Sequence, residues 1–145
     1  MKMVDVGAKP KTERVAIASA FLKMSAKALQ KIAQGQVEKG DVLAAARLAG
    51  VMAAKKTPDL IPLCHPIALS GVEVHVEPVR GGVFFTATVR TVDRTGVEME
   101  ALTAVTAAAL TVYDMLKSTD RGMVLEQVQL ENKSGGRSGT WTRKG

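Results

Sequence analysis

Four groups of residues have types and spacing that could support proton transfer or anion binding. They are Lys39-Gly40-Asp41, residues 63–66, Glu98-Met99-Glu100 and residues 113–117. In the last group, Asp114 and Lys117 are three residues apart, which puts them on one face of a predicted helix. This pair is either a surface ion pair or a positioned acid and base, and surface pairing is the more common outcome.

Two of the other groups stand at predicted helix starts, where they have a structural as well as a chemical interpretation. Lys39 precedes a helix whose free backbone donors favour a phosphate, but Asp41 can simply cap that helix. Glu98 and Glu100 open another helix, where carboxylates stabilise the positive end of the helix dipole. The local sequence of each group is therefore explained by helix capping or by the helix dipole, without a catalytic role.

The pair Cys64-His65 lies in an apolar loop that proline stiffens on both sides. His65 could bind phosphate or move a proton, or it could be a satisfied structural histidine. A zinc site is excluded because Cys64, His65 and His75 give no cluster of ligands at metal spacing. A Cys-His catalytic pair rarely comes from adjacent residues.

The carboxyl-terminal segment from about residue 133 is rich in glycine, serine and basic residues. Lys133 to Gly139 resembles a phosphate-binding loop in composition, but it lacks the Walker spacing. We expect a flexible basic tail unless a ligand or a neighbouring chain orders it.

The size and composition predict one compact domain over residues 1–145. The chain is 46% hydrophobic but only 3% aromatic, so its core must use small aliphatic side chains. The net charge of +6 and the pI near 9.7 favour an anionic partner. Scattered aromatic residues disfavour nucleic acid, although a basic nucleic-acid-binding module remains the alternative interpretation.

Cysteine usage and hydropathy indicate the compartment. Cys64 is the only cysteine, so no intramolecular disulfide can form, which is typical of a reducing compartment. The amino terminus has no apolar h-region, and we expect no membrane span elsewhere. The sequence therefore predicts a soluble cytoplasmic protein.

These groups must be positioned by alternating helices and strands. Periodicity predicts strands over residues 14–23, 72–79, 83–92 and 123–130, with a hairpin turn at Gly81-Gly82. Helices are predicted over residues 25–34, 41–56 and 97–117. Pro58, Pro62 and Pro66 predict an extended loop between them. This order predicts an α+β fold with an antiparallel sheet and helices packed on one face.

The long predicted helix separates two of the chemical groups. Glu100 and Asp114 share its stripe, but the helical rise puts them roughly 21 Å apart. They cannot serve one reacting centre within one chain. A pocket between two subunits, each giving a different end of the helix, would resolve this conflict.

Several motifs, taken together, resemble one family. Residues 39–41 (KGD), 59–66 (DLIPLCHP), 95–102 (TGVEMEAL) and 113–115 (YDM) are similar to the molybdenum cofactor biosynthesis protein C family, the cyclic pyranopterin monophosphate synthases. The resemblance runs from residues 3–6 to residues 133–136, which is nearly the whole chain. Several long motifs in the same order make it specific.

The resemblance implies a ferredoxin-like fold and a hexamer built as a trimer of dimers, with active sites at a subunit interface. It implies a lyase of molybdenum cofactor biosynthesis that converts (8S)-3',8-cyclo-7,8-dihydroguanosine 5'-triphosphate to cyclic pyranopterin monophosphate and releases pyrophosphate. It firmly implies no cofactor, although magnesium could accompany the triphosphate. No membrane or nucleic-acid partner is expected.

The resemblance also implies roles for individual residues. The catalytic set would be Asp114 as acid/base, Lys117 beside it and Lys39. The substrate-binding set would be Leu63, Cys64, His65, Met99, Glu100, Glu98, Arg14, Lys133, Asp5 and Lys9. No metal ligand is implied.

Overall fold

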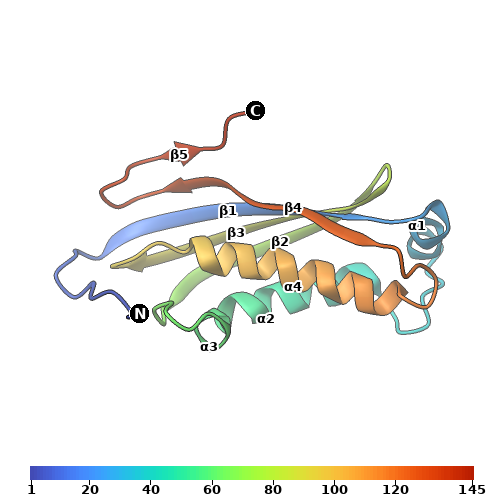
Figure 1. Cartoon of the computed structure of the whole chain (residues 1–145), viewed down its shortest axis with the longest axis horizontal. Helices are drawn as coiled ribbons and strands as arrows, with labels where there is room; N and C mark the ends of the chain where they lie inside the picture. Colours follow the sequence, from blue (N-terminus) through green and yellow to red (C-terminus); the bar gives the residue numbers. More distant parts are fainter.

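A computed structural model describes residues 1–145 as one sheet with helices beneath it (Figure 1). The strands are β1 (Thr12–Lys23), β2 (Leu69–Val79), β3 (Gly82–Asp93), β4 (Val124–Ser134) and β5 (Trp141–Thr142), in the antiparallel order β2-β3-β1-β4-β5. The helices are α1 (Ala26–Ala33), α2 (Val42–Lys55), α3 (Thr57–Leu60) and α4 (Glu98–Leu116).

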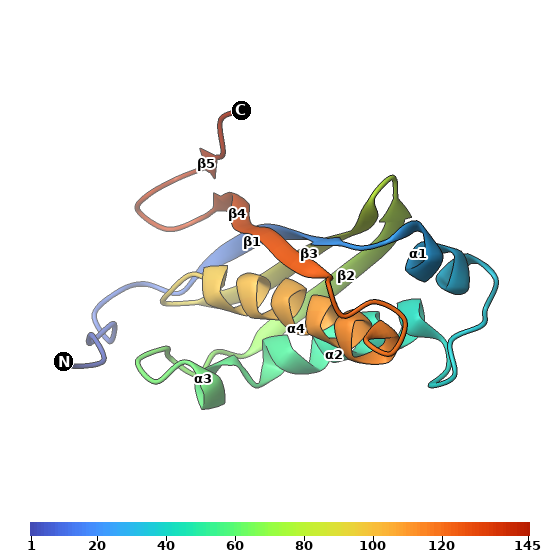
Figure 2. The same cartoon turned by 45° about the vertical axis from the view of Figure 1, so that its right-hand side comes forward.

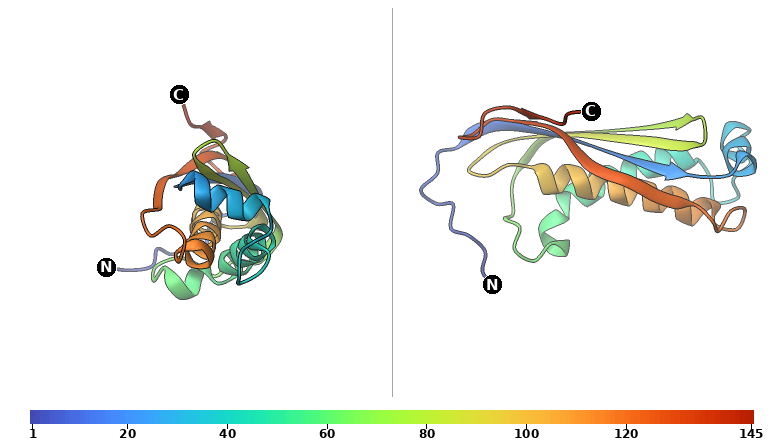
Figure 3. Two further views of the ribbon diagram at one scale, coloured as in Figure 1. Left: turned by 90° about the vertical axis from the view of Figure 1, so that its right-hand side faces the viewer. Right: turned by 45° about the horizontal axis from the view of Figure 1, so that its top comes forward.

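The helices α2 and α4 lie along one face of the sheet, and the end-on view shows the two layers (Figure 3). The α+β prediction is therefore confirmed. The strand order, with β1 between β3 and β4 and with β2 at the edge, agrees with a ferredoxin-like arrangement. The short strand β5 pairs with β4 and forms the opposite edge of the sheet.

The central strand β1 shows why the layers lie close together. Ala16, Ala18, Ala20 and Leu22 alternate along it and are at most 1% exposed. Side chains at alternate positions of a strand share a face, so this row meets the helices. Small side chains keep the distance to α4 short, as the low aromatic content predicts.

The contact between α2 and α4 also depends on small residues. A Cβ atom on Gly50 would lie 3.0 Å from a methyl carbon of Val74 and 3.1 Å from the carbonyl oxygen of Ala104. Glycine therefore lets α2 approach α4 and β2 at this point. On α4, Ala104 and Ala108 are fully buried, which continues the small-residue contact.

Helix α4 is the core helix of the fold. Val105, Ala109, Val112 and Leu116 form one buried stripe along it. Leu102, one turn before Val105, is only partly buried and borders a surface groove. By length and hydropathy alone α4 could cross a membrane, contrary to our expectation, but its buried residues form the core between sheet and α2.

Two local predictions were wrong. Residues 57–60 were expected to be extended, but they form the short helix α3, because Pro58 stands in its first turn, where no backbone donor is needed. The last strand was expected to end at residue 130, but β4 continues to Ser134. Lys133 therefore lies in a strand, where it pairs with Trp141 of β5.

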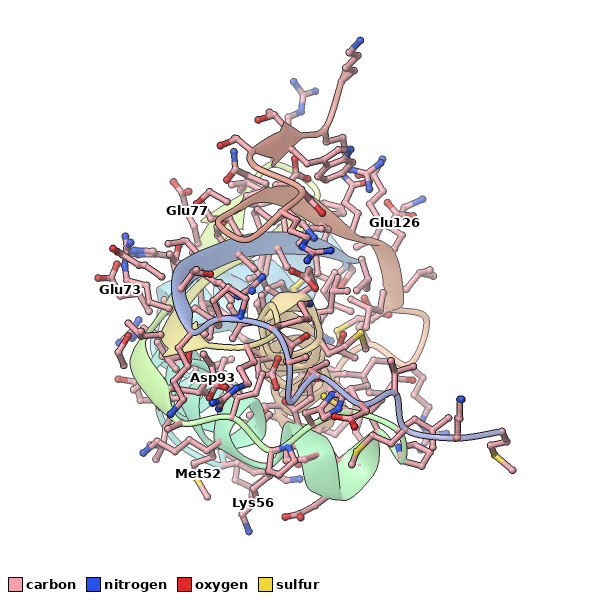
Figure 4. The ribbon with its side chains drawn as sticks, turned by 90° about the vertical axis from the view of Figure 1, so that its left-hand side faces the viewer. Met52, Lys56, Glu73, Glu77, Asp93 and Glu126 are labelled. Atoms are coloured by element: carbon pink, nitrogen blue, oxygen red, sulfur yellow. The ribbon has the colours of Figure 1, made fainter.

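The two ends of the molecule are distinct (Figure 2). The amino-terminal segment, α3 and the first turn of α4 lie at one end, and α1 lies at the other. Figure 4 views the first end and shows Met52 and Lys56 pointing away from the sheet on the outer side of the helical layer. It also shows Glu73 and Glu77 pointing outward at the β2 edge.

Candidate active site

At the carboxyl-terminal end of α4, three predicted catalytic residues meet. The Lys39 Nζ atom lies 2.8 Å from Asp114 Oδ2, and the Lys117 Nζ atom lies 2.9 Å from Asp114 Oδ1. We call these residues the lysine–aspartate triad. Asp114 lies in the last turn of α4 and Lys117 is the C-cap residue of this helix, whereas Lys39 comes from the loop between α1 and α2.

The loop that carries Lys39 is fixed by the start of α2. The Asp41 side chain accepts a hydrogen bond from the Ala44 backbone N–H at 3.1 Å, so Asp41 caps the helix as expected. The Lys39 side chain points instead to α4, where its Nζ atom also lies 3.4 Å from the Asp114 carbonyl oxygen. The capping and chemical interpretations of this motif therefore apply to different residues.

The two lysines control the protonation of Asp114. Their hydrogen bonds, with that from Lys39 the stronger influence, lower the pKa of the Asp114 carboxyl to about 2. The carboxylate is therefore ionised near neutral pH, and it accepts from two ammonium groups. Such a group can take up a proton, and the lysines can supply one or hold a phosphate.

The triad borders an open cleft of about 350 Å³. Side chains of all three residues are between 52% and 55% exposed, so a ligand in the cleft can reach them. The remaining lining residues are Lys31, Gln36, Val37, Glu38, Met115, Leu116, Ser118 and Thr119. The sequence analysis assigned none of these eight residues to the site. Most of them come from the turn after α1 and from the turn after α4, and only the fold brings these two turns together.

At the amino-terminal end of α4, a second set of predicted residues meets. Glu100 is only 2% exposed, and its Oε2 atom accepts a long hydrogen bond from the Cys64 thiol at 3.7 Å. Its other oxygen, Oε1, is buried and has no hydrogen-bond partner. We call Cys64, His65, Glu98, Glu100 and Lys133 the amino-terminal cluster.

Burial dominates the electrostatics of this cluster. Desolvation raises the pKa of the Glu100 carboxyl, and the nearby charge of Glu98 raises it further. Desolvation also raises the pKa of the Cys64 thiol to about 11, with the Glu100 carboxylate as the next cause. The cluster therefore favours protonated groups, which can donate a hydrogen bond or a proton.

Two basic residues near this end, Lys133 and Arg14, already have partners within the chain. The Lys133 Nζ atom lies 3.5 Å from Glu98 Oε1. Arg14 is 8% exposed, and its guanidinium donates to the carbonyl oxygens of Asp93 and Arg94 at 3.1 and 3.3 Å. Arg14 thus helps to hold the loop between β3 and α4.

The remaining predicted residues lie near the same end but are less closely connected. The His65 Nε2 atom lies 2.6 Å from the Val4 carbonyl oxygen, so the amino-terminal segment lies beside the loop after α3. Asp5 accepts from the Gly7 backbone N–H at 2.8 Å and, like Lys9, takes part only in a local turn. The two apolar members of the substrate-binding set are the partly exposed Leu63 and Met99.

The structure therefore brings the predicted residues together as two groups and keeps the groups apart. Glu100 and Asp114 lie near opposite ends of one continuous helix, roughly 21 Å apart by the helical rise. In neither group do three or more His, Cys, Asp or Glu side chains converge in a way that could hold a metal ion.

Comparisons with known proteins identify the family of this chain. The sequence model of the MoaC family matches residues 3–136. A cyclic pyranopterin monophosphate synthase of Thermomicrobium roseum is 57% identical over 99% of this chain and 87% of its own length. The one of Novosphingobium aromaticivorans is also 57% identical, over 97% of this chain and 89% of its own.

A third relative, cyclic pyranopterin monophosphate synthase 2 of Mycobacterium tuberculosis, is 54% identical over 98% of this chain and 85% of its own length. All three relatives are named as enzymes, which agrees with the enzyme prediction, and none is named for nucleic-acid binding. Identity above half over nearly the full chain, together with the family match, settles the resemblance: the chain belongs to the MoaC family.

Proposed function

We propose that this chain converts (8S)-3',8-cyclo-7,8-dihydroguanosine 5'-triphosphate to cyclic pyranopterin monophosphate and pyrophosphate, as a lyase of molybdenum cofactor biosynthesis. The observation that carries the proposal is the lysine–aspartate triad in an open cleft of a chain that belongs to the MoaC family. The names of its relatives give the product, and the family resemblance gives the substrate and the release of pyrophosphate.

The reaction needs both acid–base and electrostatic catalysis. A cyclic monophosphate forms when a hydroxyl oxygen of the substrate attacks the α-phosphorus, and the bond from this phosphorus to the pyrophosphate oxygen breaks. The hydroxyl proton must pass to a base, and the leaving pyrophosphate must be neutralised. Asp114 is an ionised acceptor in the cleft, and Lys39 and Lys117 supply positive charge beside it.

The amino-terminal cluster suits the other half of the substrate. Ring opening and ring closure of the purine-derived part need groups that donate protons to ring nitrogen or oxygen atoms. Glu100 has a raised pKa and an oxygen without a protein partner. We assign it as a donor to the ring system, with Cys64 and Met99 beside it.

These two halves can serve one substrate only if two copies of the chain share a site. Between them, α4 and α3 border an apolar groove of about 340 Å³, lined by Leu60, Ile61, Met99, Leu102, Thr103, Thr106, Ala107 and Leu110. An antiparallel second copy of α4 in this groove would bring the Glu100 end of one chain to the Asp114 end of the other. We therefore propose a homo-oligomer, with the hexamer expected from the family resemblance.

Two further expectations remain part of the proposal. Magnesium would arrive with the triphosphate as part of the substrate complex. A cytoplasmic location is supported by the single cysteine, Cys64, which can form no intramolecular disulfide.

The direct test is incubation of the purified chain with the cyclised GTP derivative. We expect stoichiometric appearance of cyclic pyranopterin monophosphate and pyrophosphate, measured by chromatography and by a coupled phosphate assay. Product formation without pyrophosphate, or no turnover with an authentic substrate, would contradict the proposal. Tight, salt-sensitive binding to RNA or DNA with no competition by GTP-like ligands would favour the nucleic-acid alternative.

A further inference from the structure

The cleft beside the triad contains a third lysine that the reaction has not yet used. Lys31 stands in the last turn of α1 and lines the same cleft as Lys39 and Lys117. It is half-buried, and its side chain makes no ion pair or hydrogen bond in the structure. By contrast, Lys39 and Lys117 share the single charge of Asp114.

The backbone around Lys31 is fixed at the end of α1. The Gln36 N–H donates to the Lys31 carbonyl oxygen at 2.9 Å, and the Gly35 N–H donates to the Ile32 carbonyl oxygen at 3.2 Å. This is the Schellman pattern, and Gly35 supplies the left-handed residue that it needs, with φ of 63°. The turn sends the chain back along the cleft, so that Lys31 and Lys39 border the same space.

The charge in the cleft is unbalanced. Three ammonium groups line it, from Lys31, Lys39 and Lys117, against the two carboxylates of Glu38 and Asp114. Ser118 and Thr119 add hydroxyl donors at the other side. Hydroxyl and ammonium donors around an open space are the arrangement that binds phosphate oxygens.

We propose that Lys31 is a third phosphate-binding residue of this cleft, and that it contacts the polyphosphate chain of the substrate and the pyrophosphate product together with Lys39 and Lys117. This inference rests on the proposed function and names a contact that the family motifs do not include. Lys31 acts on binding and not on proton transfer. Its loss should therefore raise KM and weaken product inhibition while kcat changes little.

A structural role must be separated from this one, because a lysine in the last turn of a helix also stabilises the negative end of the helix dipole. Lys31→Met removes the charge but keeps the aliphatic stem, and Lys31→Arg keeps both. Lys27→Met is the matched control, because Lys27 lies on the same helix, is exposed and does not line the cleft. A purely structural role would lower the unfolding temperature without changing ligand affinity.

The experiment is calorimetric titration of the full-length assembled protein with inorganic pyrophosphate, followed by steady-state kinetics. Lys31→Met should weaken pyrophosphate binding by roughly five- to tenfold, as loss of one partly exposed charge-assisted contact predicts. Lys31→Arg should remain within about twofold of the wild type, and Lys27→Met should bind as the wild type does. KM for the substrate should rise in parallel with the loss of pyrophosphate affinity.

Pyrophosphate affinity and KM both unchanged in Lys31→Met would overturn the inference, as would a wild-type protein that does not bind pyrophosphate. An equal loss in Lys27→Met would also overturn it, because the effect would then be general electrostatic attraction. Pyrophosphate binding needs no turnover, so the two proposals can fail separately. If the wild type binds pyrophosphate through Lys31 but does not convert the substrate, only the proposed function fails.

Discussion

The two ends of α4 carry acidic groups in opposite electrostatic states. At the carboxyl-terminal end, Asp114 is 53% exposed and its pKa is lowered to about 2 by two lysines. At the amino-terminal end, Glu100 is 2% exposed and burial raises its pKa. One helix therefore carries one carboxyl group whose pKa is lowered and another whose pKa is raised.

The difference follows from what surrounds each group rather than from its residue type. Lysine side chains reach Asp114 from two elements, and the charged form is favoured because it is paired. Glu100 faces Cys64 and the core, with no cation in contact, so burial raises its pKa. Opposite shifts of two acidic groups are the pattern expected for an acid and a base in one reaction.

The largest expected effect comes from removing the ionised partner. Asp114→Asn should lower kcat by about a thousandfold or more, as expected for loss of a positioned acid–base group. The unfolding midpoint should stay near the wild-type value, because all members of the triad are half-exposed. Steady-state turnover and thermal unfolding check the two statements.

The pH dependence of wild-type stability checks the assignment of Asp114 as a paired, ionised carboxylate. A lowered pKa means that the ion pairs contribute stability above the ordinary aspartate pKa, 3.8, and lose it only as pH falls toward about 2. Wild-type stability should therefore show no step from Asp114 between pH 5 and 9. Near-normal turnover in both Asp114→Asn and Lys117→Met would remove the triad from the mechanism.

The second expected effect tests whether the two ends meet between chains. Glu100→Ala and Asp114→Ala should each be inactive alone. After subunit exchange, mixed pairs of chains have one site with both residues intact, so random mixing should restore about one quarter of wild-type activity. Activity before and after exchange, with mixed assembly verified by differential tags, measures this.

Assemblies that are verified as mixed but stay inactive would contradict the shared site. Glu100 and Asp114 would then act in separate places, or Glu100 would only be a buried structural group. Mixing Asp114→Ala with Lys117→Ala is the matched control. These residues lie on one chain within 2.9 Å, so their mixtures should not recover activity through sharing.

The sequence predicts those features of the two ends of α4 that depend on residues close together in the chain, and not those that depend on contacts between distant residues. The pairing of Asp114 with Lys117 follows from helical spacing, and the distance to Glu100 follows from helical rise. The antiparallel sheet with helices on one face followed from the order of periodic segments. The sequence could not place Lys39 beside Asp114, because this contact joins residues 75 positions apart in the chain. For the same reason it could not bring Lys31 of α1 to the same cleft.

Other errors had local causes. The three prolines predict an extended loop after α2, but proline is compatible with the first turn of a short helix, which is where Pro58 lies. The basic tail was separated at residue 133 by composition, although Lys133 continues the ladder with Ala16 of β1. Strand pairing is non-local, so glycine-rich sequence after a strand gives little information on where the strand ends.

The third effect concerns the thiol at the buried end. With a pKa raised from 9.0 to about 11, Cys64 should react with iodoacetamide at pH 8 roughly a hundredfold more slowly than an ordinary thiol, because the thiolate reacts. Replacing Glu100 with Gln removes the carboxyl group that raises the thiol pKa through its charge and its hydrogen bond, and should increase the rate severalfold. A mass-spectrometric time course measures both rates.

A Cys64 rate equal to that of a model peptide thiol would contradict the buried-end description. An unchanged rate in Glu100→Gln would show that desolvation alone sets the thiol pKa. Because all reactions are run at one pH, the comparison is free of changes in reagent reactivity. Cys64 is the only cysteine, so no other thiol contributes to the signal.

The smallest expected effect concerns the partly exposed ion pair near the buried end. Lys133 and Glu98 lie 3.5 Å apart, and their side chains are 28% and 31% exposed. Lys133→Ala should therefore lower the free energy of unfolding by less than about 1 kcal/mol, with the difference falling further in high salt. Urea denaturation at two salt concentrations measures this loss, and Glu98→Gln should give a similar one.

A loss well above this size in both variants would mean that the pair is desolvated in the assembly, as expected if the partner chain covers it. Turnover then separates two roles of Lys133. Activity within about twofold of the wild type indicates a purely structural ion pair, whereas a raised KM with normal stability supports the substrate-binding role that the family resemblance implies.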